Sequence, residues 1–282
     1  MEKKTYYAKI TPAGDGPGLK LREVREYRDL ILLFARRSFT VSYKQTILGP
    51  LWLLINPLLS SVVYTVVFGT IAGLSTDGVP RILFYLVGNA FWGYFSSCLS
   101  DNQSTFVSNA HLFGKVYFPR LVVPLSRMLC GIIRLGIQLL LVSGFLVWYT
   151  VTGEVSPHWW ALPLLPLAVL QLGLLGMGCG LVASGMTTKY RDLSSLVSFG
   201  LRLWMYATPV IYPMSQVTDG TLSRLILLNP VTEPFEQLRY AILGVGSVSV
   251  GYSLLSWGLT LAVLLVGILI FNRVERTFID TV

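Results

Sequence analysis

The sequence is poor in charged residues, cysteine and histidine, and each shortage disfavours a class of protein. Asp, Glu, Lys and Arg make up 13% of the 282 residues, about half the fraction that soluble domains carry. The three cysteines, Cys98, Cys130 and Cys179, lie within apolar segments, which favours buried thiols over a disulfide or a metal site. There is no His/Glu zinc motif and no Ser/His/Asp constellation around His111 and His158, so candidate enzymatic acids and bases are few.

Acidic residues are also missing from the long apolar segments. All fourteen Asp and Glu residues lie in connecting segments, in tails or at segment edges. Carriers coupled to protons or sodium need a carboxylate or a comparable ligand at mid-membrane, so a secondary carrier is disfavoured. The sequence also lacks a G-x-x-x-x-G-K-[ST] loop, so we expect no ATP site and no cofactor on this chain.

Long apolar blocks take the place of these missing groups. Hydrophobic residues make up 53% of the chain and the mean hydropathy is +0.63. About 20 apolar residues suffice for a helix to cross a bilayer, so the sequence predicts an all-α polytopic membrane protein with six transmembrane helices. The expected spans lie near residues 49–72, 82–100, 121–150, 160–186, 193–212 and 250–272.

The distribution of basic residues predicts the orientation. Ten of the 22 Lys and Arg residues precede the first span, and the positive-inside rule then places the N-terminus in the cytoplasm. With six spans, both termini are cytoplasmic. The net charge of +8 therefore indicates contact with the inner membrane surface and its lipids, and not with nucleic acid. The first apolar block begins only near Ile47, so no secretory signal peptide is expected.

Three regions follow from the pattern. Residues 1–18 are polar and rich in Gly and Pro and form a flexible leader; residues 47–282 form the transmembrane domain. Between them, residues 19–46 predict a cytoplasmic amphipathic helix, because apolar residues recur at helical spacing among charges. We expect this helix to lie at the inner membrane surface; the alternative is a helix docked on another protein.

Two connections between spans are unusual. Residues 100–119 form a moderately polar cytoplasmic stretch with helical spacing of apolar residues. Residues 213–249 lie outside and read as two short helices around the turn Asn229-Pro230, with Thr232 as N-cap of the second and Glu233 and Pro234 in its first turn. Neither helix can cross a bilayer, so we expect a re-entrant hairpin buried by protein.

Aromatic and cationic residues share faces of the predicted spans. Ser195, Phe199, Arg202, Tyr206 and Pro209 fall on one side of the fifth span. Arg202 lies near mid-membrane, where a charge normally faces a cavity or a partner. Such a face suits a sugar, since aromatic rings stack on pyranose rings. Structural pairing of Arg202 across a dimer is the alternative.

A second ladder lies on the first span, and two features indicate packing. Trp52, Asn56, Ser60 and Tyr64 share a face, although an aromatic belt explains Trp52 as well. Gly176, Gly180 and Ser184 lie four residues apart in the fourth span, which predicts close approach of another helix. Arg134, in the third span, needs a partner that the sequence does not identify.

These features resemble one family of membrane proteins. The resemblance rests on Ile47–Trp52 (ILGPLW), Asn109–Arg120 (NAHLFGKVYFPR), Lys189–Leu193 (KYRDL) and Leu228–Pro230 (LNP) with the helix that follows to Arg239. In this order, with six spans, they resemble the permease subunits of ABC transporters that export polysaccharides, the O-antigen and teichoic-acid exporters.

The resemblance implies specific partners and roles. Such permeases pair as homodimers with two copies of an ABC ATPase subunit, which holds the ATP and Mg²⁺, and they reside in the bacterial inner membrane. It implies a substrate conduit at Trp52, Tyr64, Phe199, Arg202 and Tyr206. It also implies coupling to the ATPase at Asn109, His111 and Lys115, and an outer gate at Asn229, Pro230 and Arg239.

The expected function is export of a lipid-linked polysaccharide, with O-antigen preferred, by a subunit that is not itself an enzyme. Teichoic acid, capsule and a small lipid or drug are alternative substrates of the same class. A membrane-embedded glycosyltransferase would need a carboxylate at a membrane edge, for which Asp101 and Asp192 are the cytoplasmic candidates.

Overall fold

The computed structural model describes residues 21–44, 46–113, 118–190 and 192–279, which form helices joined by turns, with no strand among them. The helices are α1 (Leu21–Glu26), α2 (Arg28–Tyr43), η1 (Gly49–Leu51), α3 (Trp52–Tyr64), the π-helix η2 (Thr65–Ile71), α4 (Arg81–Gln103), α5 (Thr105–Phe113), α6 (Val122–Val151), η3 (Trp159–Ala161), α7 (Leu164–Thr187), α8 (Leu193–Tyr206), η4 (Met214–Gln216), α9 (Gly220–Leu228), α10 (Thr232–Leu243) and α11 (Val250–Ile279). The predicted all-α class is confirmed.

Five helical segments in this part of the chain are long and apolar enough to cross a membrane. They are Gly49–Ile71, Arg81–Gln103, Val122–Val151, Leu164–Thr187 and Val250–Glu275. Each matches an expected span to within a few residues, so the chain is a multi-pass membrane protein.

The expected span over residues 193–212 is shorter in the structure than the sequence predicts. Helix α8 has 14 residues and ends at Tyr206, so it measures about 21 Å at 1.5 Å per residue, against a hydrocarbon core of about 30 Å. Pro209 explains the early end, because it lacks an N–H and disfavours a helical conformation at Thr208. Pro209 is buried, so it does not extend the exposed face of α8 as the sequence predicted.

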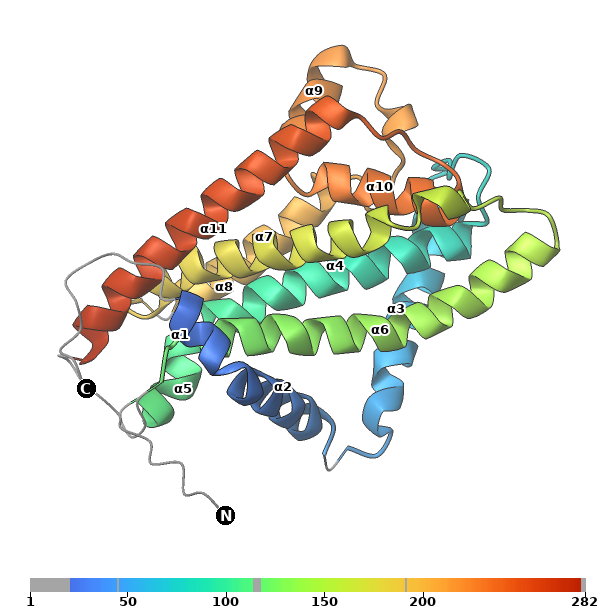
Figure 1. Ribbon diagram of the computed structural model, residues 1–282. Coiled ribbons are helices and arrows are strands. Elements are labelled where there is room, and N and C mark those ends of the chain that lie inside the picture. The colour runs from blue at the N-terminus through green and yellow to red at the C-terminus, as the bar shows by residue number, and fades with distance from the viewer. Residues whose placement is uncertain (1–20, 45, 114–117, 191, 280–282) are drawn as a thin grey trace.

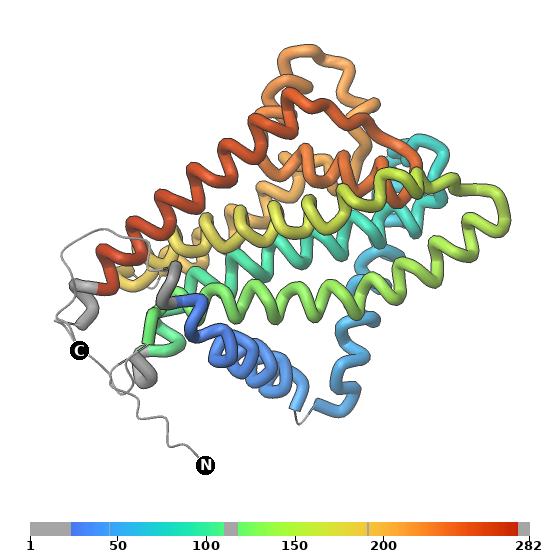
Figure 2. The backbone as a smooth tube through the Cα atoms, in the orientation of Figure 1, coloured from blue at the N-terminus to red at the C-terminus, as the bar shows by residue number. Residues whose placement is uncertain are grey.

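Helices α4 and α7 form the centre of the bundle. In the most apolar stretch of each helix, 72% of the residues of α4 and 56% of those of α7 are buried, against 11% for the first span. The other helices therefore surround α4 and α7. Helices α3 and α6 pack on α4, and α11 packs on α7. Figure 2 shows α4, α6 and α7 running side by side.

The predicted small-residue ladder lets α7 approach α4 closely. A Cβ added at Gly176 would lie 2.8 Å from the carbonyl oxygen of Phe95, and one at Gly180 would lie 2.7 Å from that of Leu99. Gly178 faces the other way, where an added Cβ would lie 2.9 Å from the Cα of Leu264 on α11. Glycine is therefore required on two sides of α7.

The two ends of the bundle differ in what they contain. Helices α1, α2 and α5 and the C-terminal end of α11 gather at one end, whereas α9, α10 and the turns after η2 and α6 lie toward the other (Figure 1). Helix α2 packs on α6, and the ring of Phe34 meets that of Phe118 at 5.7 Å. The N-terminal helices are therefore docked on the membrane domain of the same chain.

The structure supplies the missing partner of Arg134. Its Nη1 lies 3.4 Å from Oδ2 of Asp101 on α4, and its Nη2 donates to Oγ of Ser42 at 3.3 Å. One arginine on α6 thus connects α4 with the end of α2. Asp101 is accordingly a structural ion-pair partner, which leaves a catalytic role for it without support.

Candidate functional site

Helix α8 presents aromatic and cationic side chains on its exposed side. Phe199 is 56% exposed and Tyr206 57% exposed, and Arg202 between them is exposed as well. The opposite side packs inward through the buried Leu201 and Met205. The shared face that the sequence predicts for Phe199, Arg202 and Tyr206 is confirmed.

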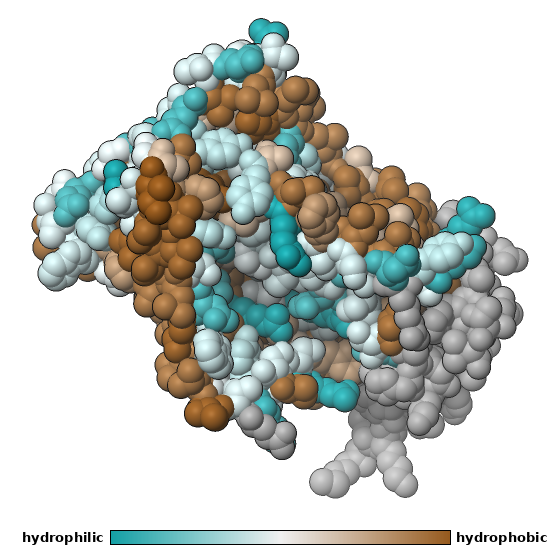
Figure 3. All heavy atoms as spheres, turned by 180° about the vertical axis from the view of Figure 1, so that it is seen from behind, coloured by the Kyte–Doolittle hydropathy of each residue, from teal (hydrophilic) through white to brown (hydrophobic). Residues whose placement is uncertain are grey.

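Arg202 makes no hydrogen bond or ion pair to any residue that the structure describes. Because α8 passes behind α4 and α7 in Figure 1, its outer face belongs to the side of the molecule shown in Figure 3. On that side a paler, more hydrophilic strip runs between two apolar columns (Figure 3). A single chain therefore leaves the exposed Arg202 guanidinium without a partner among the described residues.

Tyr64 joins the first span to α8, whereas Trp52 does not. The Tyr64 Oη lies 3.9 Å from Sδ of Met205, and its ring lies 6.2 Å from that of Tyr85 on α4. Trp52 is the first residue of α3 and Tyr64 the last, so about 18 Å separates them along the helix. Of the two predicted residues of the first span, Tyr64 is the one that lies beside α8.

The predicted coupling segment forms the short helix α5. Phe106 anchors it, because its buried ring stacks on Phe271 of α11 at 4.6 Å. Asn109 leaves the helical conformation, with φ −121° and ψ 15°, and its Nδ2 donates to the carbonyl oxygen of Thr105 at 2.8 Å. His111 lies within α5 but its side chain is outside the described part of the structure, and Lys115 is outside the described residues altogether.

Helices α9 and α10 form the expected hairpin, and Asn229 fastens its turn to the end of α8. The Nδ2 of Asn229 donates to Oγ1 of Thr208 at 2.9 Å, and its Oδ1 accepts from Nε1 of Trp204 at 3.1 Å and from the backbone N–H of Val231 at 3.2 Å. The carbonyl oxygen of Pro230 accepts from Oγ of Ser256 at 2.7 Å. The turn is therefore held by both α8 and α11.

Arg239 is a buried anchor of the hairpin. It is 2% exposed, pairs with Glu236 at 3.4 Å, and lies over the ring of Phe84 at 4.2 Å. Its guanidinium also donates to the carbonyl oxygens of Val210 at 3.0 Å and Tyr212 at 3.2 Å. Because these carbonyls belong to the irregular segment after α8, one side chain fixes α10 against that segment.

Two buried carboxylates in α10 were not expected from the sequence. Glu233 is 1% exposed, with Oε1 2.6 Å from Oγ of Ser253, and Glu236 pairs with Arg239. Burial raises the pKa of the Glu233 carboxyl, and the hydrogen bonds from Ser253 and Gln237 oppose that shift. The spacing of Glu236 and Arg239, three residues apart on one helix, is the feature of the sequence that could have indicated this ion pair.

The predicted cap of α10 is wrong. The helix begins at Thr232, and the N-cap position is occupied by Val231 without a side-chain hydrogen bond. The Thr232 hydroxyl instead donates to the carbonyl oxygen of Ile226 at 2.6 Å, so it joins α10 to α9. A side-chain cap is present one helix earlier, where Asp219 Oδ1 accepts from the N–H of Thr221 at 2.8 Å.

The geometry combines an exposed aromatic and cationic face, a helix at one end of the bundle and a fastened hairpin toward the other. Among the described residues, no group of three His, Cys, Asp or Glu side chains comes together that could hold a metal ion. These parts suit binding and movement of a solute.

Comparison with known proteins shows which family this chain resembles in sequence. The model of the family described as ABC-2 type transporter matches residues 29–243. The chain is 27% identical over 254 residues to the O-antigen export system permease protein RfbA of Klebsiella pneumoniae, which covers 89% of this chain and 94% of that relative. It is 31% identical over 217 residues to the protein of the same name from Myxococcus xanthus, with 75% and 79% covered.

Proposed function

Because this chain belongs to the ABC-2 type transporter family, we propose that it forms the channel of an ATP-driven exporter of lipid-linked polysaccharide in the bacterial inner membrane. Membership makes the chain a transport subunit that lacks an ATPase domain and works with an ABC ATPase subunit. The relatives named above are O-antigen export permeases, so O-antigen is the preferred polymer.

The observation on which the proposal chiefly rests is the exposed face of α8. A guanidinium that faced lipid near mid-membrane would cost about 2.5–3.5 kcal/mol on insertion scales. That cost falls if a second copy of the chain encloses the face of Arg202 in a hydrated path. Phe199 and Tyr206, exposed on either side, would offer flat apolar surfaces to pyranose rings.

The proposed assembly is a homodimer with two ATPase subunits, which hold the ATP and Mg²⁺. Helix α5 would transmit their motion, with Asn109, His111 and Lys115 near the contact. The packing of α5 supports this role, because Phe106 stacks on Phe271 of α11. A displacement of α5 would therefore be transmitted directly to α11. Substrate would then pass as the conduit alternates between closed and open states.

The proposed topology has six crossings with both termini in the cytoplasm. Helix α8 and the turns over residues 207–212 together make the fifth crossing, which the hydrogen bonds of Asn229 and Arg239 hold against the hairpin. The α9–α10 hairpin then re-enters from the outer side as a gate. The gate would be held in a fixed position relative to the conduit by Asn229, Pro230 and Arg239.

A transport assay in cells tests this function. In a strain whose export depends on this chain, Arg202→Ala should lower surface polysaccharide by about tenfold, the factor that 1.4 kcal/mol of lost substrate contact produces. Leu203→Ala is the matched control, because Leu203 is 54% exposed one residue away and should leave export unchanged. A loss of folded dimer with Arg202→Ala would instead assign Arg202 a structural role.

A further inference from the structure

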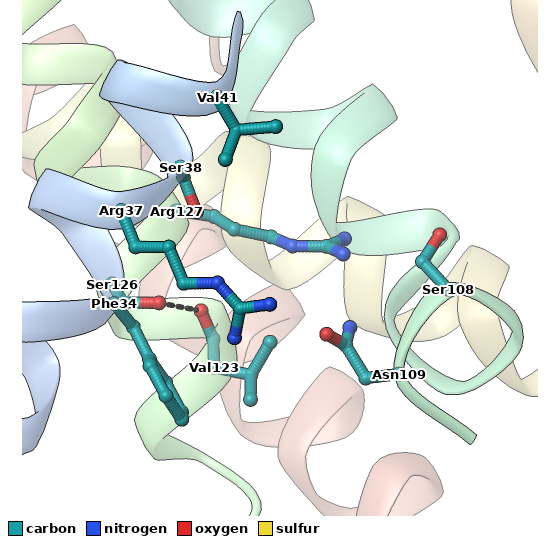
Figure 4. Close-up of a pocket in the computed structure, with 9 residues that line it drawn as sticks. All are labelled: Phe34, Arg37, Ser38, Val41, Ser108, Asn109, Val123, Ser126 and Arg127. Atoms are coloured by element: carbon teal, nitrogen blue, oxygen red, sulfur yellow. Dashed lines mark hydrogen bonds between the residues drawn. The ribbon is translucent and has the colours of Figure 1, made fainter. Parts of the chain in front are cut away.

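A pocket at the α5 end of the bundle brings together two arginines from different helices. It has a volume of about 200 Å³ and lies between α2, α5 and α6. Its lining residues are Phe34, Arg37, Ser38, Val41, Ser108, Asn109, Val123, Ser126 and Arg127. Figure 4 shows the guanidiniums of Arg37 and Arg127 entering the same space from α2 and α6, with Ser108 and Asn109 facing them from α5.

The positive charge of this pocket is not neutralised by its own walls. No lining residue among those described is acidic. Asp101, whose charge acts on Arg127, is paired with Arg134 at 3.4 Å. Two guanidiniums in one cavity repel each other, so an anion between them would remove an unfavourable interaction as well as add favourable ones.

Arg127 is held by hydrogen bonds from one of its guanidinium nitrogens, and its other N–H groups have no partner among the described residues. Its Nη1 donates to Oγ of Ser104 at 3.2 Å and to Oγ1 of Thr105 at 3.4 Å. Its Nε and Nη2 make no hydrogen bond to a described residue. Arg37 is exposed and forms no ion pair within the described part of the chain. Planar guanidiniums with free N–H groups match the oxygens of a phosphate.

The surroundings of the pocket favour a lipid as the source of that phosphate. Val41, on the rim, is 66% exposed, and Leu32 and Leu33 on the same helix are 57% and 60% exposed. Exposed apolar residues beside basic ones are typical of a helix that lies in the membrane interface. Basic pockets between helices on the cytoplasmic side suit acidic head groups.

We propose that this pocket binds the phosphate group of an anionic phospholipid of the cytoplasmic leaflet. The proposal rests on the topology given under Proposed function, in which α2 and α5 lie on the cytoplasmic side. A bound head group would join α2, α5 and α6, and therefore connects the lipid to the helix proposed to meet the ATPase.

Native mass spectrometry of the purified full-length chain, titrated with phosphatidylglycerol or phosphatidylcholine in neutral detergent, tests the proposal. Wild type should retain phosphatidylglycerol in preference to phosphatidylcholine. Arg37→Gln and Arg127→Gln should each weaken that binding about fivefold, since one basic residue near an acidic lipid contributes about that factor. Arg36→Gln is the matched control, because it removes the same charge from the neighbouring position of α2, outside the pocket.

Several results would overturn the proposal. Unchanged phosphatidylglycerol binding in Arg37→Gln would do so. A loss of binding in Arg36→Gln as large as that in Arg37→Gln would also do so, because it would show that the lipid responds to the overall basic charge of α2 and not to the pocket. Displacement of the lipid by glycerol phosphate at equal concentration would identify a site for soluble phosphate. Arg37 is exposed, so its variant should fold even if Arg127→Gln does not.

A separate measurement keeps this test apart from that of the proposed function. An impermeant thiol reagent should label a cysteine at Ser108 in inside-out vesicles and not in right-side-out vesicles. Lipid binding itself requires neither ATPase nor polysaccharide. Failure of the topology, of lipid binding and of export can therefore be told apart.

Discussion

At the scale of single residues, buried polar groups fasten the irregular parts of the chain. Arg239 donates to the backbone carbonyls of Val210 and Tyr212 in the irregular segment after α8. Asn229 binds Trp204 and Thr208 at the end of α8 and the N–H of Val231 within its own turn. Backbone that leaves the helix inside a membrane protein must find such partners. These side chains therefore allow the chain to turn after α8.

Arg239 is the residue whose loss should destabilise the protein most. Arg239→Ala leaves Glu236 buried without its partner, a change that costs about 3–5 kcal/mol in buried ion pairs. We expect a large fall in melting temperature and in folded yield in detergent. Arg224→Ala, on the exposed side of α9, is the control. Equal melting temperatures for the two variants would contradict the anchoring role.

At the scale of elements, the α4–α7 contact depends on glycine. An alanine at Gly180 would place its Cβ 2.7 Å from a backbone oxygen of α4, so Gly180→Ala should separate the helices and lower stability by about 1–3 kcal/mol. Gly200 on α8 has open space around its Cα, so Gly200→Ala should be neutral or mildly stabilising. Thermal unfolding of both variants measures the difference.

Helix α5 carries the prediction about coupling. A cysteine in place of Asn109 should crosslink to the ATPase subunit in the intact complex, because Asn109 lies near the end of the bundle that contains α2 and α5. A cysteine at Ser143, exposed within α6, should not crosslink. Absence of crosslinking at 109 while ATPase and permease remain bound would contradict a coupling role for this part of α5.

The sequence predicted elements better than it predicted their contacts. Five spans were apparent because block length and hydropathy act locally, and the face of Phe199, Arg202 and Tyr206 followed from helical spacing. The end of α8 was missed because the apolar composition continues past Tyr206, whereas Pro209 breaks the helix. The burial of Glu233 and Glu236 was missed because it depends on α7 and α11, which pack on α10 from distant parts of the chain.

At the scale of the whole molecule, the exposed face of α8 predicts an incomplete conduit in one chain that a second copy completes. Cysteines at Phe199 and Tyr206 should therefore react with a membrane-impermeant thiol reagent in the ATP-cycling complex. A cysteine at Leu254, 70% exposed on α11, should be shielded by lipid. No labelling at either α8 position would count against a water-filled path along this face.

Reconstituted transport tests the central claim most directly. Proteoliposomes that contain this chain, its ATPase subunit and a lipid-linked polysaccharide should show ATP-dependent movement of the polymer across the bilayer, measured by access of an added glycosidase. Arg202→Ala should abolish most of this movement while ATP hydrolysis and the dimer persist, and Leu203→Ala should not. Polymer that stays protected in the wild-type complex, although ATP is hydrolysed, would contradict the account.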